Sequence, residues 1–274
     1  MLFIIFIILL SLNIYFNRDA YCDKDSWQLS LTGQRDLLEY QYRLGKQLMG
    51  WNLHCSFKEE LKINNRILVI ANHMNYLDGF LISKYLSEQF PAHYIHPVTR
   101  GDITCIPYFG NVIKNNCICL DRDFQKDQTT IRDRVNSIKK YEENSIILIF
   151  PEGTNRCPET EASSRSWCYS NSIKEFDNLL SPRRKGIQLL NEVYQPQLIL
   201  DLTIFYPDDY LNYKAQYITD LLFNIIPKEA VILTSTLNLS DPDDPDSNPK
   251  TIEYLMKRWY QKDAFFNKLK DLSN

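Results

Sequence analysis

Two short polar segments carry the residue types that acid–base chemistry needs. They read NHMNYLD at residues 72–78 and FPEGT at residues 150–154. Each follows an apolar, β-branched run, at residues 67–71 and 146–149, that predicts a buried strand. Both segments would therefore leave the carboxyl end of a strand, the edge where open α/β sheets bind their ligands. A histidine, an aspartate and a glutamate are predicted to converge there, as proton abstraction next to an anionic substrate requires.

The spacing of His73 and Asp78 restricts the local structure. On an unbroken helix five residues turn through about 500°, which leaves the two side chains roughly 140° apart. They meet only if His73 lies in a turn and Asp78 in the helix that follows, and Asn72 and Asn75 suit a turn or an N-cap. The carboxylate would then hold one ring nitrogen and aim the other at a hydroxyl, while the helix terminus favours the neutral ring. Taken alone, the motif fits a histidine that only satisfies a polar turn equally well.

Together the two segments resemble the N-H-x4-D and F-P-E-G-T signatures of the glycerolipid acyltransferases, the 1-acylglycerol-3-phosphate acyltransferase family. Residues 107–110 and 118–123 are similar to the family's intermediate block, which ends in a substrate-binding arginine, here Arg122. The likeness covers about residues 50–262. Three further segments resemble the branch that contains lysocardiolipin acyltransferase: residues 164–166, 201–207 and 257–259.

The resemblance implies transfer of a fatty acyl group from acyl-CoA to the free hydroxyl of a lysophospholipid, of the lysophosphatidic acid or lysocardiolipin kind. It assigns His73 as the general base and Asp78 as its orienting partner. An imidazole with a pKa near 6.5 suits this role, and a thioester is already activated. No metal, no covalent acyl-enzyme and no cofactor are expected, since acyl-CoA is a co-substrate. The resemblance does not fix the headgroup, the acyl length or the hydroxyl that is acylated.

Four further residues are candidates for binding the glycerol-phosphate part of the substrate: Arg122, Glu152, Gly153 and Thr154. Arginine recognises phosphate in a planar, bidentate manner, and Gly153 would let backbone N–H groups approach an anion. Glu152 would bond a substrate hydroxyl or fix Arg122. The alternatives are a surface Arg122 paired with a neighbouring aspartate and a Glu152 that is only a turn residue.

The chain departs from the family pattern at several charges. Asn155 and Arg156 follow FPEGT where some members have Arg-Ser, so Arg156 either replaces that charge one position later or faces solvent. Arg100 stands where the family often has lysine. The basic run at residues 183–185 is typical of a solvated surface, or alternatively meets the phosphates of CoA or of a two-phosphate headgroup.

Two other classes of function remain open. A hydrolase would deliver the acyl group to water with the same base, although no G-x-S-x-G motif supplies a serine nucleophile. A catalytically silent lipid-binding relative would keep the fold, but the intact candidate residues argue against it.

Length and composition agree with one elaborate α/β domain. The 274 residues carry 31 basic and 34 acidic side chains, which gives no argument for nucleic-acid binding. The seven cysteines lack zinc-site spacing and a disulfide framework, so we expect reduced thiols that face the cytosol. The sequence gives no indication of the oligomeric state.

The amino terminus predicts association with a bilayer. Residues 1–16 are almost entirely Leu, Ile and Phe, just short of the roughly 20 residues needed to cross a membrane. No basic n-region or clear cleavage site is present, which favours a retained anchor over a signal peptide. We therefore predict a membrane anchor at residues 1–17, in an endomembrane such as the endoplasmic reticulum. The flanking charges do not fix its orientation.

In residues 34–51, which follow, apolar side chains recur at roughly helical spacing and predict a helix. It fits an interfacial helix beside the anchor or a helix on the core, with Trp51 at the headgroups or inside. The predicted organisation is thus an anchor, a juxtamembrane helical segment at residues 18–50 and an acyltransferase domain at residues 51–274.

The rest of the chain alternates strands and helices. This order predicts an α/β fold with a mixed, mostly parallel sheet flanked by helices on both faces. Further strands are expected at residues 94–95, 117–120, 197–206 and 230–237, and helices at residues 127–141 and from Pro249 to Leu269.

Overall fold

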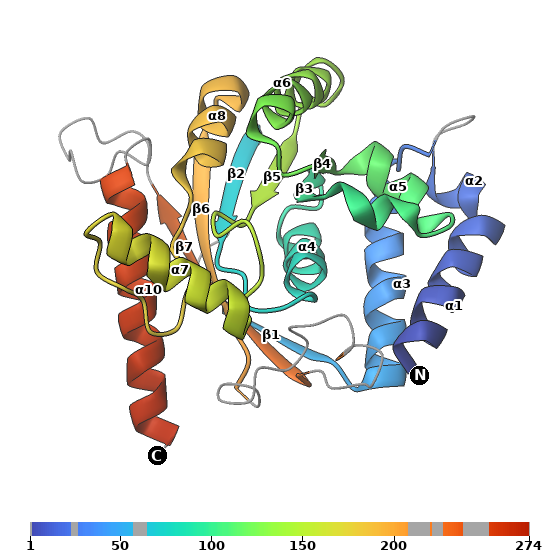
Figure 1. Cartoon of the computed structure of the whole chain (residues 1–274). Helices are drawn as coiled ribbons and strands as arrows, with labels where there is room; N and C mark the ends of the chain where they lie inside the picture. The colour runs from blue at the N-terminus through green and yellow to red at the C-terminus, as the bar shows by residue number, and fades with distance from the viewer. Residues whose placement is uncertain are drawn as a thin grey trace.

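A seven-stranded mixed sheet forms the centre of the protein (Figure 1). The computed structural model describes residues 2–22, 27–56, 65–207, 220, 227–237 and 252–273. In chain order the strands are β1 (Asn52–Ser56), β2 (Arg66–Ala71), β3 (Tyr94–Arg100), β4 (Ile118–Leu120), β5 (Ser145–Ile149), β6 (Leu198–Phe205) and β7 (Glu229–Leu237).

The strands lie in the order β1-β7-β6-β2-β5-β3-β4. The five from β6 to β4 run parallel to one another. β7 is antiparallel to β6 and pairs in parallel with β1. The predicted mixed, mostly parallel sheet is confirmed, while the edge strand β1 was not predicted.

Helices cover both faces of the sheet, because each central strand sends apolar side chains alternately to either side. Ile67 and Val69 of β2 join one buried cluster, and Leu68 and Ile70 join the other. The helices are α1 (Leu2–Phe16), α2 (Arg18–Tyr21), α3 (Leu31–Met49), α4 (Asp78–Gln89), η1 (Gly101–Cys105), α5 (Phe109–Asn116), α6 (Phe124–Tyr141), α7 (Pro158–Ser170), α8 (Arg184–Tyr194) and α10 (Ile252–Ser273). Side chains of α1, α3 and α4 belong to the first cluster, and those of α6, α8 and α10 to the second.

The helix predicted at residues 34–51 is α3, and it packs on the core. Ser30 caps its first turn by accepting a hydrogen bond from the backbone N–H of Gly33, and Gly50 ends it in the left-handed conformation. Leu37 and Leu44 are buried, as is Trp51 after the helix. Packing inside is therefore confirmed for this segment. The predicted start of the last helix, at Pro249, lies outside the described residues.

The predicted membrane anchor is a short helix, α1, which lies beside α3 (Figure 1). Phe6, Leu10 and Ile14, four residues apart, are buried on one side, and the Phe6 ring lies 5.6 Å from that of Trp51. Its 15 residues extend only about 22 Å, whereas a hydrocarbon core is roughly 30 Å thick. Among the helices of the described ranges, none combines the length and apolar character needed to cross a bilayer. The prediction of a spanning anchor is thus not supported.

Candidate active site

The turn after β2 brings His73 and Asp78 together. His73 lies in the turn and Asp78 is the first residue of α4, so the chain reverses between them as the five-residue spacing requires. Nδ1 of His73 lies 2.8 Å from Oδ2 of Asp78. Asn75 shapes the turn by accepting a hydrogen bond from the backbone N–H of Leu77, which is itself the N-cap residue. The asparagines therefore build the turn and do not cap the helix.

Asp78 is held in one orientation by several donors. Its side chain is fully buried, and Oδ2 also accepts hydrogen bonds from the backbone N–H groups of Met74 (2.5 Å) and Asn75 (2.9 Å). The hydroxyl of Tyr206, just after β6, donates to Oδ1. The sequence analysis did not identify Tyr206. A carboxylate fixed in this way can orient the ring of His73 but is closed to a ligand.

The imidazole of His73 is positioned between the protein and solvent. Its side chain is 20% exposed, and its ring stacks on that of Phe150 at 4.3 Å between centroids. Because the Asp78 carboxylate accepts from Nδ1–H, the lone pair of the neutral ring lies on Nε2. Asn72 pins the turn to β6 by exchanging two hydrogen bonds with the backbone of Ile204, of 2.9 and 3.0 Å. This geometry suits a general base.

Arg122 and the turn after β5 meet beside this histidine. The guanidinium of Arg122 is exposed, and Nη2 lies 3.4 Å from the carbonyl oxygen of Gly153, which adopts a φ of 74°. Partial burial lowers the pKa of Arg122, as do the nearby charges of Arg100 and Arg183, whereas Asp102 and Tyr76 raise it. Tyr76 belongs to the turn of His73, so the two predicted segments do converge.

The alternative interpretation of Arg122 as one half of a surface ion pair finds no support. In the described part of the chain no carboxylate lies within ion-pair distance of Arg122, and Asp123 instead caps α6 through the backbone N–H of Gln125. Thr154, half-buried, follows Gly153 at the same edge.

Glu152 faces the interior. Its side chain is 2% exposed, and Oε1 accepts a hydrogen bond of 3.1 Å from the indole N–H of Trp259 on α10. Burial raises the pKa of Glu152 to about 8, against the lowering effects of Trp259 and Lys262. The predicted contact with Arg122 is not found, since that guanidinium reaches Gly153 instead. A direct bond to a substrate hydroxyl finds no support in this burial.

The charge of Lys262 acts on Glu152, and it belongs to a group of charges that we call the inner cluster: Asp201 and Lys262, which are buried, and Arg258, which is partly exposed. Nη2 of Arg258 and Nζ of Lys262 each lie 2.6 Å from the carboxylate of Asp201. Burial lowers the pKa of Lys262 against the raising effect of Asp201. The sequence analysis gave these residues no role, although segments 201–207 and 257–259 resembled the family branch.

Arg156 does not replace a charge at the ligand edge. It is buried, and its Nε lies 2.5 Å from Oε1 of Glu161 on α7. The interpretation that it faces solvent is wrong. Its backbone N–H donates to the carbonyl of His73, so residue 156 supports the turn of His73 through its main chain.

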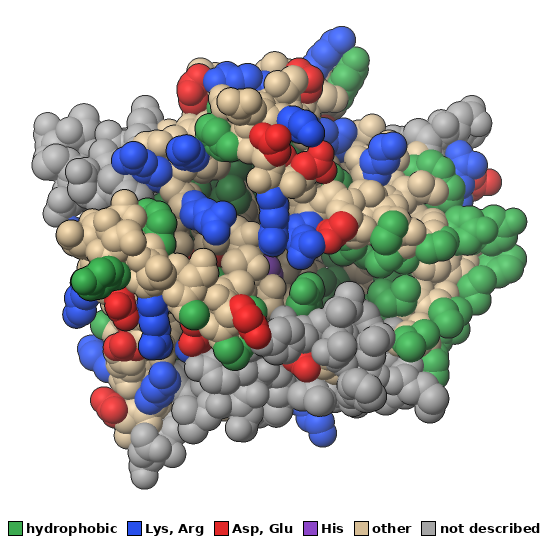
Figure 2. Space-filling view, viewed as in Figure 1, with side chains coloured by type: hydrophobic (Ala, Val, Ile, Leu, Met, Phe, Trp, Pro, Cys, Tyr) green, Lys and Arg blue, Asp and Glu red, His purple; other side chains and the backbone are tan. Residues whose placement is uncertain are grey.

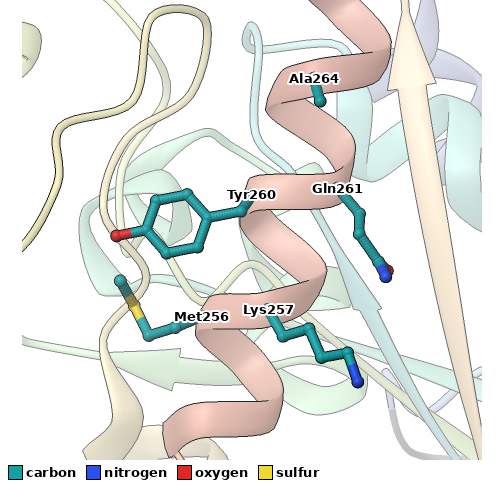
Figure 3. Close-up of a pocket in the computed structure, with 5 residues that line it drawn as sticks. All are labelled: Met256, Lys257, Tyr260, Gln261 and Ala264. Atoms are coloured by element: carbon teal, nitrogen blue, oxygen red, sulfur yellow. The ribbon is translucent and has the colours of Figure 1, made fainter.

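The surface around the site is basic. Figure 2 shows Lys and Arg side chains gathered around a hollow in which a histidine is visible. A separate pocket of about 560 Å³ lies against α10 and contains none of the predicted site residues (Figure 3). It is lined by Met256, Lys257, Tyr260, Gln261 and Ala264.

Comparisons with known proteins point to acyltransferases. A family model described as Acyltransferase matches residues 52–187, which include both segments. The lysophosphatidylinositol acyltransferase 10 of Caenorhabditis elegans is 25% identical over 80% of this chain and 56% of its own. The lysocardiolipin acyltransferase 1 of Gallus gallus is 24% identical over 72% of this chain and 52% of its own. The chain thus spans little more than half the length of these relatives.

A solved structure shares the fold. The crystal structure of the 1-acyl-sn-glycerophosphate acyltransferase PlsC from Thermotoga maritima superposes with a TM-score of 0.55 at 14% identity, covering 97% of this chain and 95% of that one. Residues 52–187, which hold both signatures at one edge of the sheet, therefore carry an acyltransferase-family domain. The chain is similar to acyltransferases named for lysophosphatidylinositol, lysocardiolipin and 1-acyl-sn-glycerophosphate.

Proposed function

We propose that the protein transfers a fatty acyl group from acyl-CoA to the free hydroxyl of a lysophospholipid. The 2.8 Å contact between His73 and Asp78 carries this proposal, since it leaves Nε2 as the basic atom of a partly exposed ring. The acyltransferase-family domain supports the reaction class. The names of the relatives include three different lysolipids, so the headgroup is assigned by class only.

The step needs one base. As the lysolipid oxygen attacks the thioester carbonyl carbon, Nε2 of His73 takes the hydroxyl proton, and Asp78 stabilises the imidazolium that forms. The carbon–sulfur bond then breaks, and the CoA thiolate leaves with the proton returned from His73. The products are the phospholipid and CoA, and the enzyme regains its starting state.

The substrate phosphate would lie at the edge where Arg122, Gly153 and Thr154 meet. An exposed guanidinium without a carboxylate partner in the described ranges is free to bind an anion. We assign Glu152 a positioning role, because it is buried below the same turn and bonded to Trp259.

The exposed side of α1 would rest on the bilayer that holds the lipid substrate. Figure 2 shows hydrophobic side chains gathered at this edge of the molecule. An apolar helix side of this kind inserts into the interface between headgroups and acyl chains, where aromatic rings are favoured. An endomembrane such as the endoplasmic reticulum is the expected location. The exposed residues are Ile4, Ile8, Leu9, Leu12, Tyr15 and Phe16.

Labelled acyl-CoA tests the reaction. The protein is incubated in vesicles with a panel of lysolipids: lysophosphatidic acid, lysophosphatidylinositol, lysophosphatidylcholine and monolysocardiolipin. Labelled phospholipid from at least one of them is the expected result. Release of labelled fatty acid without phospholipid would instead identify a hydrolase, and unchanged acyl-CoA would identify a silent relative, so either result would refute the proposal.

A further inference from the structure

A second arginine, Arg183, lies against the turn that carries the FPEGT segment. A side-chain carbon placed on Gly153 would lie 3.6 Å from Cδ of Arg183 and 3.8 Å from its Nε and Nη1. The backbone N–H of Arg183 donates to the carbonyl of Pro151 at 2.7 Å, which fixes this residue beside the turn. The main chain of Arg183 is therefore fixed at the turn, and its side chain extends next to Gly153.

Arg122 approaches the same glycine. Its Nη2 lies 3.4 Å from the Gly153 carbonyl, and the positive charge of Arg183 lowers the pKa of Arg122. The two exposed guanidiniums thus lie close enough to repel each other, and Gly153, which has no side chain, lies between them. Arg100 adds a third positive charge nearby, but it is paired with Asp102.

In the part of the chain that the structure describes, neither of the two guanidiniums has a carboxylate within ion-pair distance, and the nearest acidic influence on Arg122, that of Asp102, comes from a side chain already paired with Arg100. Like charges held together without a carboxylate repel, and a bound dianion removes that repulsion. Arginine guanidiniums bind phosphate oxygens through parallel N–H bonds, and Gly153 places no side chain between these two.

We propose that Arg183 and Arg122 form the two sides of one phosphate-binding site, with Gly153 between them. The inference rests on the proposed function for the source of the phosphate, which is the lysolipid headgroup or the nucleotide part of CoA. Arg183 is then a substrate-binding residue, whereas the sequence alone favoured a solvated surface for the basic run at residues 183–185.

Direct binding tests this site without turnover. Isothermal titration calorimetry measures the affinity of the full chain for glycerol 3-phosphate, which represents the lysolipid headgroup, and separately for CoA, which represents the acyl donor. Arg183→Gln should weaken one of the two affinities about tenfold, as expected when one hydrogen bond to a charged group is lost. Arg183→Lys keeps the positive charge but not the planar guanidinium that bonds phosphate in a bidentate manner, so it should give a smaller loss of affinity. The matched control is Arg132→Gln, an exposed arginine on α6 paired with Glu192 on α8, which should change neither affinity by more than about twofold.

Each outcome decides the proposal. A loss for glycerol 3-phosphate assigns the site to the lysolipid, and a loss for CoA assigns it to the acyl donor. Unchanged affinities in Arg183→Gln, an equal loss in Arg132→Gln, or no binding of either probe by the wild type would overturn it. If the wild type binds a phosphate through Arg183 yet forms no labelled phospholipid, the proposed function fails and the phosphate site stands.

Discussion

The FPEGT turn separates two groups of charges that differ in their burial and in their pairing with carboxylates. Outside it, Arg122 and Arg183 are exposed and have no carboxylate within ion-pair distance among the described residues. Inside it, the inner cluster pairs Asp201 with Lys262, both buried, and with Arg258, whose side chain is 24% exposed. The exposed side of this turn thus carries charges that can bind a ligand, and its inner side faces charges that stabilise the fold.

The contrast shows how charge can be divided between function and stability. Exposed like charges are screened by water and change stability little, so they are available to bind an anion. Buried charges must be paired, because an ion left alone in the interior loses its hydration without compensation. Changes outside the turn should therefore alter binding, and changes inside it should alter stability.

The largest expected effect on stability is that of Asp201→Ala. This change leaves Lys262, 3% exposed, without its counter-ion. We expect the free energy of unfolding to fall by about 3–5 kcal/mol in urea denaturation. Asp102→Ala is the matched control, because it removes the partner of exposed Arg100 and should lower stability by about 0–1 kcal/mol. Equal losses in the two variants would contradict the comparison.

Trp259→Phe should have an intermediate effect. The substitution keeps a buried aromatic ring but removes the N–H that bonds Oε1 of Glu152. An unpaired buried carboxyl oxygen lowers stability by about 1–3 kcal/mol, measured by the same denaturation. Exposed Trp167→Phe should leave stability within about 0.5 kcal/mol of wild type. If both tryptophan variants behave alike, the hydrogen bond to Glu152 contributes nothing.

Glu152 should also make stability depend on pH. Its pKa is raised from 4.5 to about 8 in the folded protein, so between these values the folded state holds a proton that the unfolded state has lost. The stability contributed by Glu152 is complete below pH 4.5 and falls as the pH rises to about 8.

Glu152→Gln removes this titration while keeping the shape of the side chain. The variant should gain stability relative to wild type between pH 5 and pH 8, as followed by urea denaturation at both values. A difference from wild type that is the same at the two pH values would show that Glu152 does not titrate in this range.

The smallest effect on folding is expected outside the turn, for Arg122→Gln. Because this side chain is exposed, unfolding should change by less than about 0.5 kcal/mol. The KM for the lysolipid should nevertheless rise about tenfold with little change in kcat. A fall in stability with an unchanged KM would show that Arg122 supports the fold and does not bind the substrate.

The parts of the site formed by residues close together in the chain could be predicted from the sequence. Strands β2 and β5 follow from their apolar runs, and the meeting of His73 with Asp78 follows from a five-residue spacing. Such contacts depend on turn geometry, which a few neighbouring residues determine.

Contacts between distant segments could not be predicted in this way. Trp259 and Glu152 are 107 residues apart, and His96 bonds Glu142, 46 residues away, at 2.6 Å. These pairs depend on which strands become neighbours in the sheet. The apolar amino terminus likewise predicted a spanning helix, because hydropathy alone does not reveal that Phe6 and Leu10 have a protein surface to pack on.

The central claim is that His73 is the base. The most direct measurement compares kcat of His73→Ala with that of wild type, using labelled acyl-CoA and the preferred lysolipid in vesicles. Loss of a general base should lower kcat by about 10²- to 10⁴-fold, with vesicle binding and unfolding unchanged. A variant that folds, binds vesicles and keeps more than roughly a tenth of the wild-type kcat would contradict the account.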